Sequence, residues 1–352
     1  MAGAFQEKKS IVYVFLSLEG NRFSRTLNYY HGIQKLGLVA HWFEINPRRK
    51  NRGIRDVVRN FRFSDVVFVV ASPSHVLVPY LRVRTRRKVV LDAGWPLYDG
   101  VIQSRREFGI LGWRLFLTFS LDFLAFHFAN TIFLETCAQI DACRRRYLLP
   151  ENKLFDLATG FDENRFKGFG STTTSIRKPQ DPIVLFRGGP QDEAGLQVLF
   201  EAIKYVNTSN RVRFVVISKL KIPEAFNSEN LEVISDFQDD LVLWNLYREA
   251  VFVLGQLSNH SRLDKTLPHK FFEAGFFKKA YVTSDRGVIG NYVKTNEVVG
   301  FKAGNAIDLA RKLNELLSSP KQIDFLGNSI SGLYMRNFAQ DILTRHFLKC
   351  LS

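Results

Sequence analysis

Cysteine and methionine are scarce in this chain, which has three cysteines and two methionines among 352 residues. The cysteines, Cys137, Cys143 and Cys350, match no metal-binding spacing and cannot form an even set of disulfides. This scarcity excludes a disulfide-stapled secreted domain and a cysteine-rich metal site. It favours a reducing compartment, so we expect a cytoplasmic protein.

Three further signatures are missing. The first apolar run, at residues 11–16, is too short for a signal-peptide core and predicts a strand instead. No G-x-G-x-x-G loop follows that strand, which argues against a two-domain dehydrogenase. The sequence also has no paired-aspartate metal signature, and we expect neither a metal site nor a bound cofactor.

Positive charge is what the chain has in excess, with a formal net charge of +15. Residues 1–165 hold 25 Lys and Arg against 15 Asp and Glu, whereas the remaining residues hold 24 against 19. A basic first half could meet an anionic membrane surface, a phosphorylated acceptor or nucleic acid. The alternative is that each basic run is an ordinary solvated face. Because no recognised nucleic-acid motif accompanies the charge, we expect no nucleic-acid partner.

Alternating strand and helix patterns predict an α/β fold, and the length of the chain suggests two domains. Buried apolar strands are expected in a first domain at residues 1–166. Residues 167–182 are rich in Gly, Ser, Thr and Pro and predict a linker. A second domain is expected at residues 183–335, followed by a final helix at 336–352. We therefore predict two facing Rossmann-like domains with a cleft between them, where sites often lie.

The most informative stretch is a strand–loop–helix–strand pattern at residues 250–284. Pro268 suits the first turn of the helix, and the amides near Leu267 and His269 would be free donors for a phosphate. Lys270 adds a positive charge in that turn, where the helix dipole favours an anion. Glu273, one turn deeper, could accept hydrogen bonds from ribose hydroxyls. The alternative is an ordinary amphipathic helix with a solvated Lys and Glu.

A glycine-containing loop follows the first strand of the second domain. Gly188 and Gly189 would let the backbone approach a phosphate, and Arg187 could bind that phosphate with a bidentate fork. We therefore expect Arg187, Gly188 and Gly189 to contribute to phosphate binding together with Lys270.

The order Pro268-x-Lys270-x-x-Glu273, followed by a small-residue turn and a strand, resembles the nucleotide-sugar motif of family 4 retaining glycosyltransferases. The resemblance implies the GT-B fold, in which the terminal helix often crosses back to the first domain. It implies a nucleoside diphosphate sugar as donor, with Glu273 holding its ribose and with Arg187 and Lys270 stabilising the charge of the leaving diphosphate. It also implies a carbohydrate or lipid-linked acceptor and retention of anomeric configuration. Carried over by position, Gly20 lies in the first glycine-containing loop, and Asp92 faces the transferred sugar as a catalytic group.

Three positions depart from that family's pattern. Gly189 stands at the usual arginine, Ala194 at the usual lysine and Lys265 at a common second glutamate. These departures leave open a second interpretation, in which the chain is a catalytically impaired nucleotide-sugar-binding or scaffold subunit on the same fold.

Residues 108–128 form the most apolar segment, and its length approaches that of a membrane span. Arg114, Asp122 and His127 interrupt it, and charges near the middle of a span are costly in lipid. We predict a helix that lies on the inner face of an anionic membrane, with Arg105 and Arg106 just before it. The alternative is a core helix of the first domain.

Overall fold

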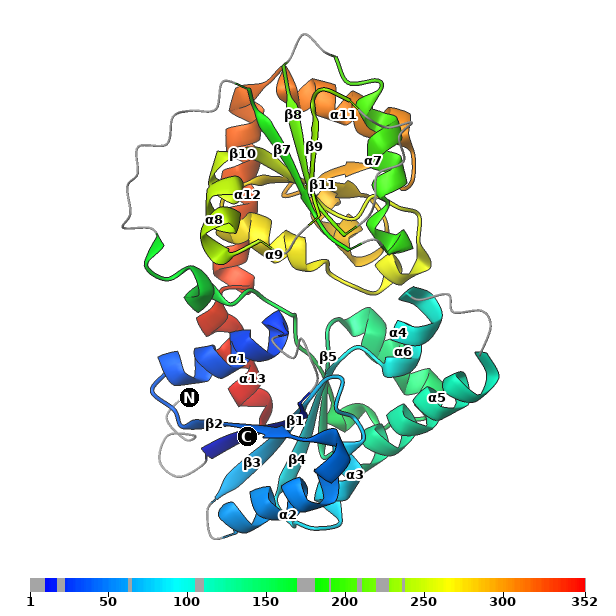
Figure 1. Ribbon diagram of the computed structural model, residues 1–352, viewed down its shortest axis with the longest axis vertical. Coiled ribbons are helices and arrows are strands. Elements are labelled where there is room, and N and C mark those ends of the chain that lie inside the picture. The colour runs from blue at the N-terminus through cyan, green and yellow to red at the C-terminus, as the bar shows by residue number, and fades with distance from the viewer. Residues whose placement is uncertain are drawn as a thin grey trace. The chain divides into compact units, whose positions relative to one another are not determined.

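The computed structural model describes residues 10–17, 23–62, 65–104, 111–169, 181–189, 191–207, 211–219, 228–235 and 238–351. The chain divides into two compact units (Figure 1). Unit 1 comprises Met1–Asp162 and Gln340–Ser352, and unit 2 comprises Glu163–Ala339. Most of the predicted linker at 167–182 lies outside the described residues, which stop at 169 and resume at 181.

Unit 1 is built on a parallel sheet of six strands. Their order across the sheet is β2 (Ala40–Ile45), β1 (Ser10–Leu16), β3 (Val66–Ala71), β4 (Lys88–Gly94), β5 (Thr131–Leu134) and β6 (Leu154–Asp156). The central strands are short apolar runs, because helices cover both faces of a parallel sheet. The strand predicted at residues 11–16 is present as β1, and β3, β4 and β5 are the buried apolar strands expected of the first domain.

The helices of unit 1 fall on the two faces that right-handed crossovers dictate. On one face α1 (Ser24–Lys35) packs against α13 (Gln340–Leu351), with the rings of Tyr29 and Phe347 5.5 Å apart. The other face is covered by α2 (Lys50–Asn60), α3 (Leu77–Arg82), α5 (Leu111–Phe128) and α6 (Cys137–Tyr147). A shorter helix, α4 (Leu97–Ser104), packs on α5.

Unit 2 contains a second parallel sheet of six strands. Their order is β12 (Val299–Phe301), β11 (Ala280–Ser284), β10 (Ala250–Leu254), β7 (Ile183–Arg187), β8 (Arg213–Ile217) and β9 (Leu231–Ile234). The chain runs outward from β7 to β9 and then returns to β10 on the other side of β7. The strand order therefore reverses between β7 and β10, and open α/β sheets bind ligands at the carboxyl end of such a point.

Helices also cover both faces of this sheet (Figure 1). One face carries α7 (Leu196–Ile203) and α11 (Ala306–Leu317), which share an apolar core with alternate residues of the strands. The other helices of the unit are α8 (Asp240–Glu249), α9 (His269–Phe276), α10 (Gly290–Lys294) and α12 (Pro320–Asn337). Among these, α12 packs against both α9 and β11.

The start of α9 differs by one residue from the sequence prediction. Pro268 is the N-cap of α9, with extended backbone, and His269 is the first helical residue. The helix ends at Phe276, and the φ of 54° at Lys278 is incompatible with a continuing helix. The described part of the apolar helix starts at Leu111, and residues 105–110, which include the start of the predicted segment, lie outside the described part of the chain. Within the described residues no helix combines the length and the apolarity needed to cross a membrane.

Candidate functional site

A pocket of about 450 Å³ lies at the carboxyl edge of the unit 2 sheet. Its walls come from the ends of β7, β8, β9 and β10 and from the first turn of α9, so it sits at the point where the strand order reverses. Six of the residues singled out from sequence line it together: Arg187, Gly188, Gly189, His269, Lys270 and Glu273. Residues more than 80 positions apart in the chain are thereby brought around one space.

Glu273 is the anionic centre of the pocket and is only 2% exposed. Arg187 Nη1 donates to its Oε1, and His269 Nδ1 lies 3.2 Å from the same oxygen. The hydroxyl of Tyr247, on α8, donates to Oε2. Burial alone would raise the pKa of Glu273, but the charge of Arg187, with help from His269 and Tyr247, holds this pKa well below its ordinary value. The carboxyl is therefore ionised and fixed in place.

Arg187 ends β7 and points across the pocket at this carboxylate. The charge of Glu273 raises the pKa of Arg187 despite the burial of the guanidinium. About a quarter of the Arg187 side chain remains exposed (26%), whereas Glu273 is almost completely enclosed. Part of the fork is therefore open to a second anion entering the pocket.

Lys270, in the first turn of α9, is a buried cation that lines the same pocket. Its Nζ donates to the carbonyl oxygen of Gly255 at 3.0 Å, lies 3.4 Å from Gln256 Oε1, and sits 3.7 Å from the centroid of the Phe186 ring. Burial lowers the pKa of Lys270 from 10.5 to about 7, with the nearby charge of Glu273 opposing this effect. An anion bound beside Lys270 would offset the free-energy cost of burying its positive charge.

The backbone approaches Lys270 closely at the end of β7. A Cβ added to Gly188 would lie 3.1 Å from Lys270 Nζ and 3.2 Å from the Phe186 ring. Pro268, the N-cap of α9, and the first two helical residues, His269 and Lys270, line the pocket. The backbone amides of His269 and Lys270 are therefore the N-terminal amides of the helix that lie at the pocket. Leu267 is buried and is not among the lining residues.

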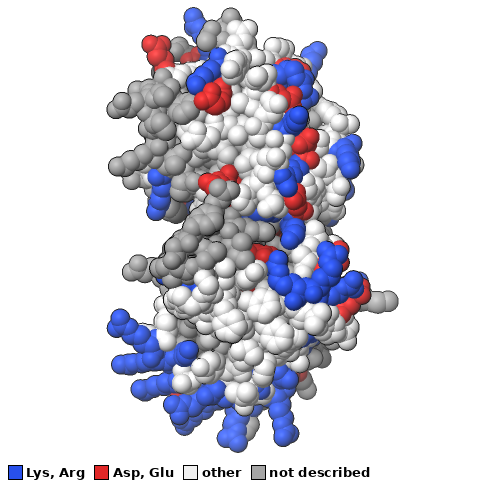
Figure 2. Space-filling model, turned by 90° about the vertical axis from the view of Figure 1, so that its right-hand side faces the viewer, with Lys and Arg blue, Asp and Glu red and all other residues white. Residues whose placement is uncertain are grey.

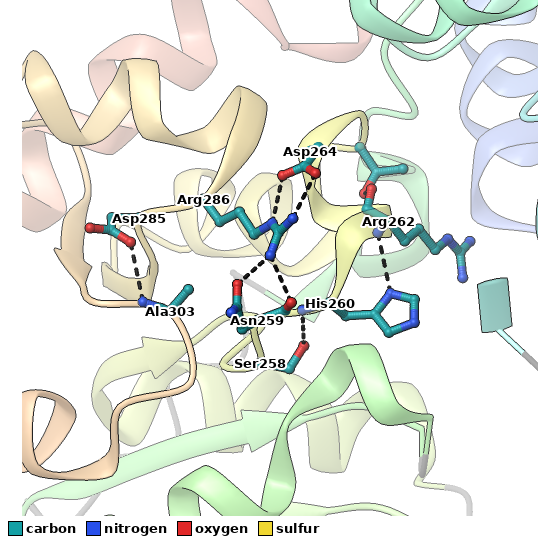
Figure 3. A network of polar contacts seen from close by, with 9 residues as sticks. Ser258, Asn259, His260, Arg262, Asp264, Asp285, Arg286 and Ala303 are labelled. Carbon is teal, nitrogen blue, oxygen red and sulfur yellow. Dashed lines mark hydrogen bonds and ion pairs between the residues drawn. The ribbon is translucent and has the colours of Figure 1, made fainter.

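The loop between β10 and α9 is held by Arg286, which follows β11 (Figure 3). Arg286 donates from Nε and Nη2 to the two oxygens of Asp264, at 2.6 and 2.8 Å, and from Nη1 to the carbonyl oxygen of Asn259 at 2.7 Å. At the left of Figure 3, the Ala303 amide donates to Asp285 Oδ1 at 3.2 Å. Three strand-end loops are thereby tied together, which fixes where α9 begins.

A second contact fixes the same loop from the side of α7. Gly195 has a φ of 71°, and a Cβ there would lie 2.4 Å from the Ser258 backbone nitrogen. The Leu257 amide donates to the carbonyl oxygen of Ala194 at 3.1 Å, and the Ser258 hydroxyl donates to that of Glu193 at 2.9 Å. Gly195 therefore serves backbone packing, and the side chain of Ala194 is buried.

Asp92 lies in unit 1 and does not line this pocket. Asp92, in β4, is 1% exposed and accepts from Arg25 Nε at 2.8 Å. Arg25 also donates to the carbonyl oxygen of Leu157 at 2.7 Å. Within the described residues, Asp92 Oδ2 has no hydrogen-bond partner. Gly20 lies outside the described residues.

Several residues that line the pocket or hold its side chains were not singled out from sequence as site residues. Tyr247 lies 26 residues before Glu273, on another helix, and only the fold brings them together. Lys219 adds a third cation at the end of β8, and polar side chains come from Gln191, Ser218 and Gln256. Ser235 and Gln238, which follow β9, also line the pocket. Among the described residues, no group of three His, Cys, Asp or Glu side chains is arranged to hold a metal ion.

No protein-family model matches the chain, and no curated protein matches it in sequence. Solved structures do share its fold. Anabaena HepE in complex with UDP-glucose has a TM-score of 0.69 at 12% identity, over 97% of this chain and 99% of that one. Sucrose-phosphate synthase from Thermosynechococcus elongatus has a TM-score of 0.70 at 11% identity, over 98% of each chain.

A UDP-GlcNAc 2-epimerase from Neisseria meningitidis, bound to UDP-GlcNAc, is also similar in structure. Its TM-score is 0.59 at 12% identity, over 97% of this chain and 99% of that one. These similarities show that the chain has the GT-B fold of two Rossmann-like domains, which confirms the predicted fold class.

Proposed function

We propose that this protein is a glycosyltransferase that moves a sugar from a nucleoside diphosphate sugar to a carbohydrate or lipid-linked acceptor. The observation that carries the proposal is the convergence of Arg187, Lys270 and the start of α9 on one pocket at the strand-order reversal of unit 2. Solved proteins with this fold bind UDP-glucose and UDP-GlcNAc, which supports a sugar nucleotide here.

The chemistry that this pocket supports is departure of a diphosphate. Negative charge grows on the leaving diphosphate while the sugar passes through an oxocarbenium-like state. Arg187, Lys270 and the amides of His269 and Lys270 are fixed donors that would meet this charge, and Lys219 adds a further cation. Because these cations can neutralise the diphosphate, we propose that the transfer needs neither a metal ion nor a cofactor.

Glu273 is proposed to position the ribose of the donor. A carboxylate offers about four lone-pair sites. Arg187 and His269 approach Oε1, and Tyr247 approaches Oε2, so Oε2 has capacity for a ribose hydroxyl. Retention of anomeric configuration follows only from the family resemblance. Asp92 is kept as the proposed catalytic group of unit 1, with Arg25 holding its other oxygen.

A second candidate is a subunit on the same fold that binds a sugar nucleotide without turning it over. The burial of Ala194 supports it, because no cation reaches the pocket from that position. Lys265, which stands where the family commonly has a second glutamate, also supports this candidate. The two candidates share the pocket and differ in turnover alone.

A thermal-shift screen against uridine, guanosine, adenosine and thymidine diphosphates and their sugars tests binding, because a ligand of the native state raises its apparent stability. NMR of the sugar with each hit then separates three outcomes. Release of free sugar or transfer supports a glycosyltransferase, an epimerised nucleotide sugar would show an epimerase, and unchanged substrate would show the binding subunit.

Two variants locate the binding site. Glu273→Gln is expected to weaken sugar-nucleotide binding at least about tenfold, which corresponds to roughly 1.4 kcal/mol. Arg187→Met is expected to lower turnover more than binding. The matched control is Glu201→Gln, on an exposed carboxylate of α7 paired with Lys204. Parent-like affinity in Glu273→Gln would remove Glu273 from the donor site.

A further inference from the structure

One face of α5 exposes large apolar side chains. Phe116 is 74% exposed and Trp113 61%, and they are joined by Leu117, Phe123, Leu124 and Phe128. At 3.6 residues per turn these six side chains fall within an arc of about 140°. They form a single stripe along the helix, which we call the α5 stripe.

The opposite side of α5 fixes which way the helix faces. Asp122, with no exposed surface, accepts from the amides of Leu97 and Tyr98 at 3.1 and 2.9 Å and from the Tyr147 hydroxyl at 3.1 Å. Phe126 lies in the core of unit 1 on the same side. The α5 stripe therefore cannot turn inward without breaking these bonds, and its exposure is a fixed property of the fold.

Basic side chains share the same face of the sheet. Because α2 packs on α3 and α3 on α5, the three helices lie side by side over one face (Figure 1). Ile54 and Val57 are buried on the inner side of α2. Arg52, Arg55 and Arg59 lie on its outer side and are exposed. Arg84 and Arg86, after α3, are exposed as well. We call these five residues the arginine row.

The arginine row carries little compensating charge. In residues 47–62 there are seven Arg and Lys against a single acid, Asp56, which lies 3.9 Å from Arg52 at a fully hydrated surface. Such exposed pairs contribute little. Figure 2 shows a broad uncharged surface on the side of unit 1 where α5 lies, with Lys and Arg gathered along its border.

We propose that this face of unit 1 docks on an anionic lipid bilayer, with the α5 stripe entering the headgroup region and the arginine row on the lipid phosphates. An apolar helix face flanked by basic groups fits the boundary of an anionic membrane. Nucleic acid would match the arginine row but leave six large apolar side chains without partners. The proposal rests on unit 1 alone and does not depend on the proposed function.

The test is sedimentation of the full-length protein with vesicles. One set contains equal parts phosphatidylglycerol and phosphatidylcholine, and the other contains phosphatidylcholine alone. Sedimentation is expected with the anionic vesicles and is expected to fall as salt is raised, because the attraction is screened. An apolar variant, Phe116→Ser with Leu124→Ser, should bind at least about tenfold more weakly. A charge variant, Arg52→Glu with Arg55→Glu, should lose a similar factor.

Matched controls make equal changes away from this face. Phe325→Ser with Ile307→Ser replaces two side chains of unit 2 that are 64% and 65% exposed. Arg345→Glu with Lys321→Glu reverses two exposed charges on α13 and α12. Both control proteins should sediment like the parent. Unchanged circular dichroism and melting temperature would show that all four variants are folded.

Four results would overturn the proposal. One is no sedimentation of the parent with anionic vesicles, and another is parent-like sedimentation of the apolar variant. A third is binding to nucleic acid that the charge variant loses, without vesicle binding. The last is self-association that the apolar variant abolishes, again without vesicle binding, which would assign the α5 stripe to a second copy of the chain. Nucleotide binding by unit 2 is measured separately, so failure here leaves the proposed function untouched.

Discussion

At the scale of single residues, the burial of the charged Lys270 side chain costs the folded protein free energy. Its ammonium is buried against two oxygens and the ring of Phe186, and its pKa falls to about 7. A charged group in such a place destabilises the folded state unless a ligand compensates it. The arrangement suits a site that is completed by an anion.

The first prediction concerns the pH dependence of nucleotide-sugar binding. The bound diphosphate should raise the pKa of Lys270 above its value of about 7 in the empty pocket. Affinity should therefore be constant below about pH 7 and fall as the pH rises further, by up to roughly tenfold per pH unit. Calorimetry from pH 6 to 9 measures this. Lys270→Met should bind more weakly and lose the dependence above pH 7, and an identical slope in this variant would contradict the assignment.

The stability of the protein gives an independent check, because it depends on pH in the opposite direction from ligand affinity. In the parent, the unfolded chain holds the Lys270 proton up to about pH 10.5, whereas the folded protein releases it near 7. The unfolded state binds more protons in this window, so the stability of the parent rises with pH from about 7 to 10.5. Lys270→Met should therefore be more stable than the parent below pH 7, with the difference fading toward pH 10.5.

The second prediction concerns Tyr247, whose hydroxyl donates to Glu273 Oε2. Its ring is stacked on Phe277 with centroids 4.6 Å apart, so Tyr247→Phe keeps the packing and removes only the hydroxyl. We expect a loss of about 1.5–3 kcal/mol in unfolding free energy, typical of a hydrogen bond to a charged group. We also expect weaker donor binding. Urea denaturation measures the first effect, and the exposed Tyr205→Phe is the control.

The residues of the pocket differ in how far the sequence could reveal them. Lys270 and Glu273 share one turn of α9, and local spacing is enough to place both on it. Arg187 follows a strand, so the topology predicts its edge of the sheet. Tyr247 could not be predicted, because its partnership with Glu273 depends on how α8 packs. The sequence also suggested nothing about the Arg187–Glu273 ion pair, since both residues were expected to face the ligand.

At the scale of elements, the loop from β10 to α9 is the part that positions the pocket. Arg286 ties it to the end of β11, and Gly195 lets it approach the start of α7. Arg286 acts on the Asp264 carboxylate and the Asn259 carbonyl oxygen. Gly195 packs against the backbone at Ser258. The position of the α9 N-terminus is therefore set by residues that do not themselves line the pocket.

The third prediction separates conformational strain from close packing at Gly195. Gly195→Ala adds a Cβ 2.4 Å from the Ser258 nitrogen, at a φ of 71°. Gly37→Ala has a similar φ, 76°, but nothing lies within 4 Å. We expect a loss of about 1–2 kcal/mol for Gly37→Ala, the cost of the left-handed conformation. Gly195→Ala should lose more, by at least about 1 kcal/mol, and should also weaken donor binding. Equal losses would show that the close approach is unimportant.

The element boundaries show where sequence patterns stop being sufficient. Strands in parallel sheets appear as apolar runs, which is why most of them could be placed from sequence. The start of α9 was misplaced by one residue, because proline is compatible with both the N-cap and the first turn. The length of the apolar segment at 108–128 predicted a helix, but only the packing of Asp122 shows which face is exposed.

At the scale of the whole molecule, α13 belongs to unit 1 although unit 2 separates it in sequence from the rest of that unit. Phe347 is fully buried and lies 5.1 Å from the ring of Phe133 in β5. Thr344 meets α1 at Gly32, where a Cβ would lie 2.0 Å from its hydroxyl oxygen. The last helix is thus part of the core of unit 1.

The fourth prediction follows from this packing. Phe347→Ala should destabilise unit 1 by about 3–5 kcal/mol, the usual cost of truncating a buried phenylalanine. Because the pocket is lined entirely by residues of unit 2, donor affinity below the melting temperature should stay within about twofold of the parent. Calorimetric melting and a binding titration measure the two effects. The control Phe325→Ala changes an exposed ring and should shift neither.

The most direct measurement is a crystal structure of the protein with a nucleoside diphosphate sugar identified by the thermal-shift screen. The account predicts diphosphate oxygens within hydrogen-bonding distance of the His269 and Lys270 amides and of the Arg187 guanidinium, with a ribose hydroxyl on Glu273. Ordered nucleotide bound elsewhere, with Arg187 still closed on Glu273 and the pocket empty, would contradict it.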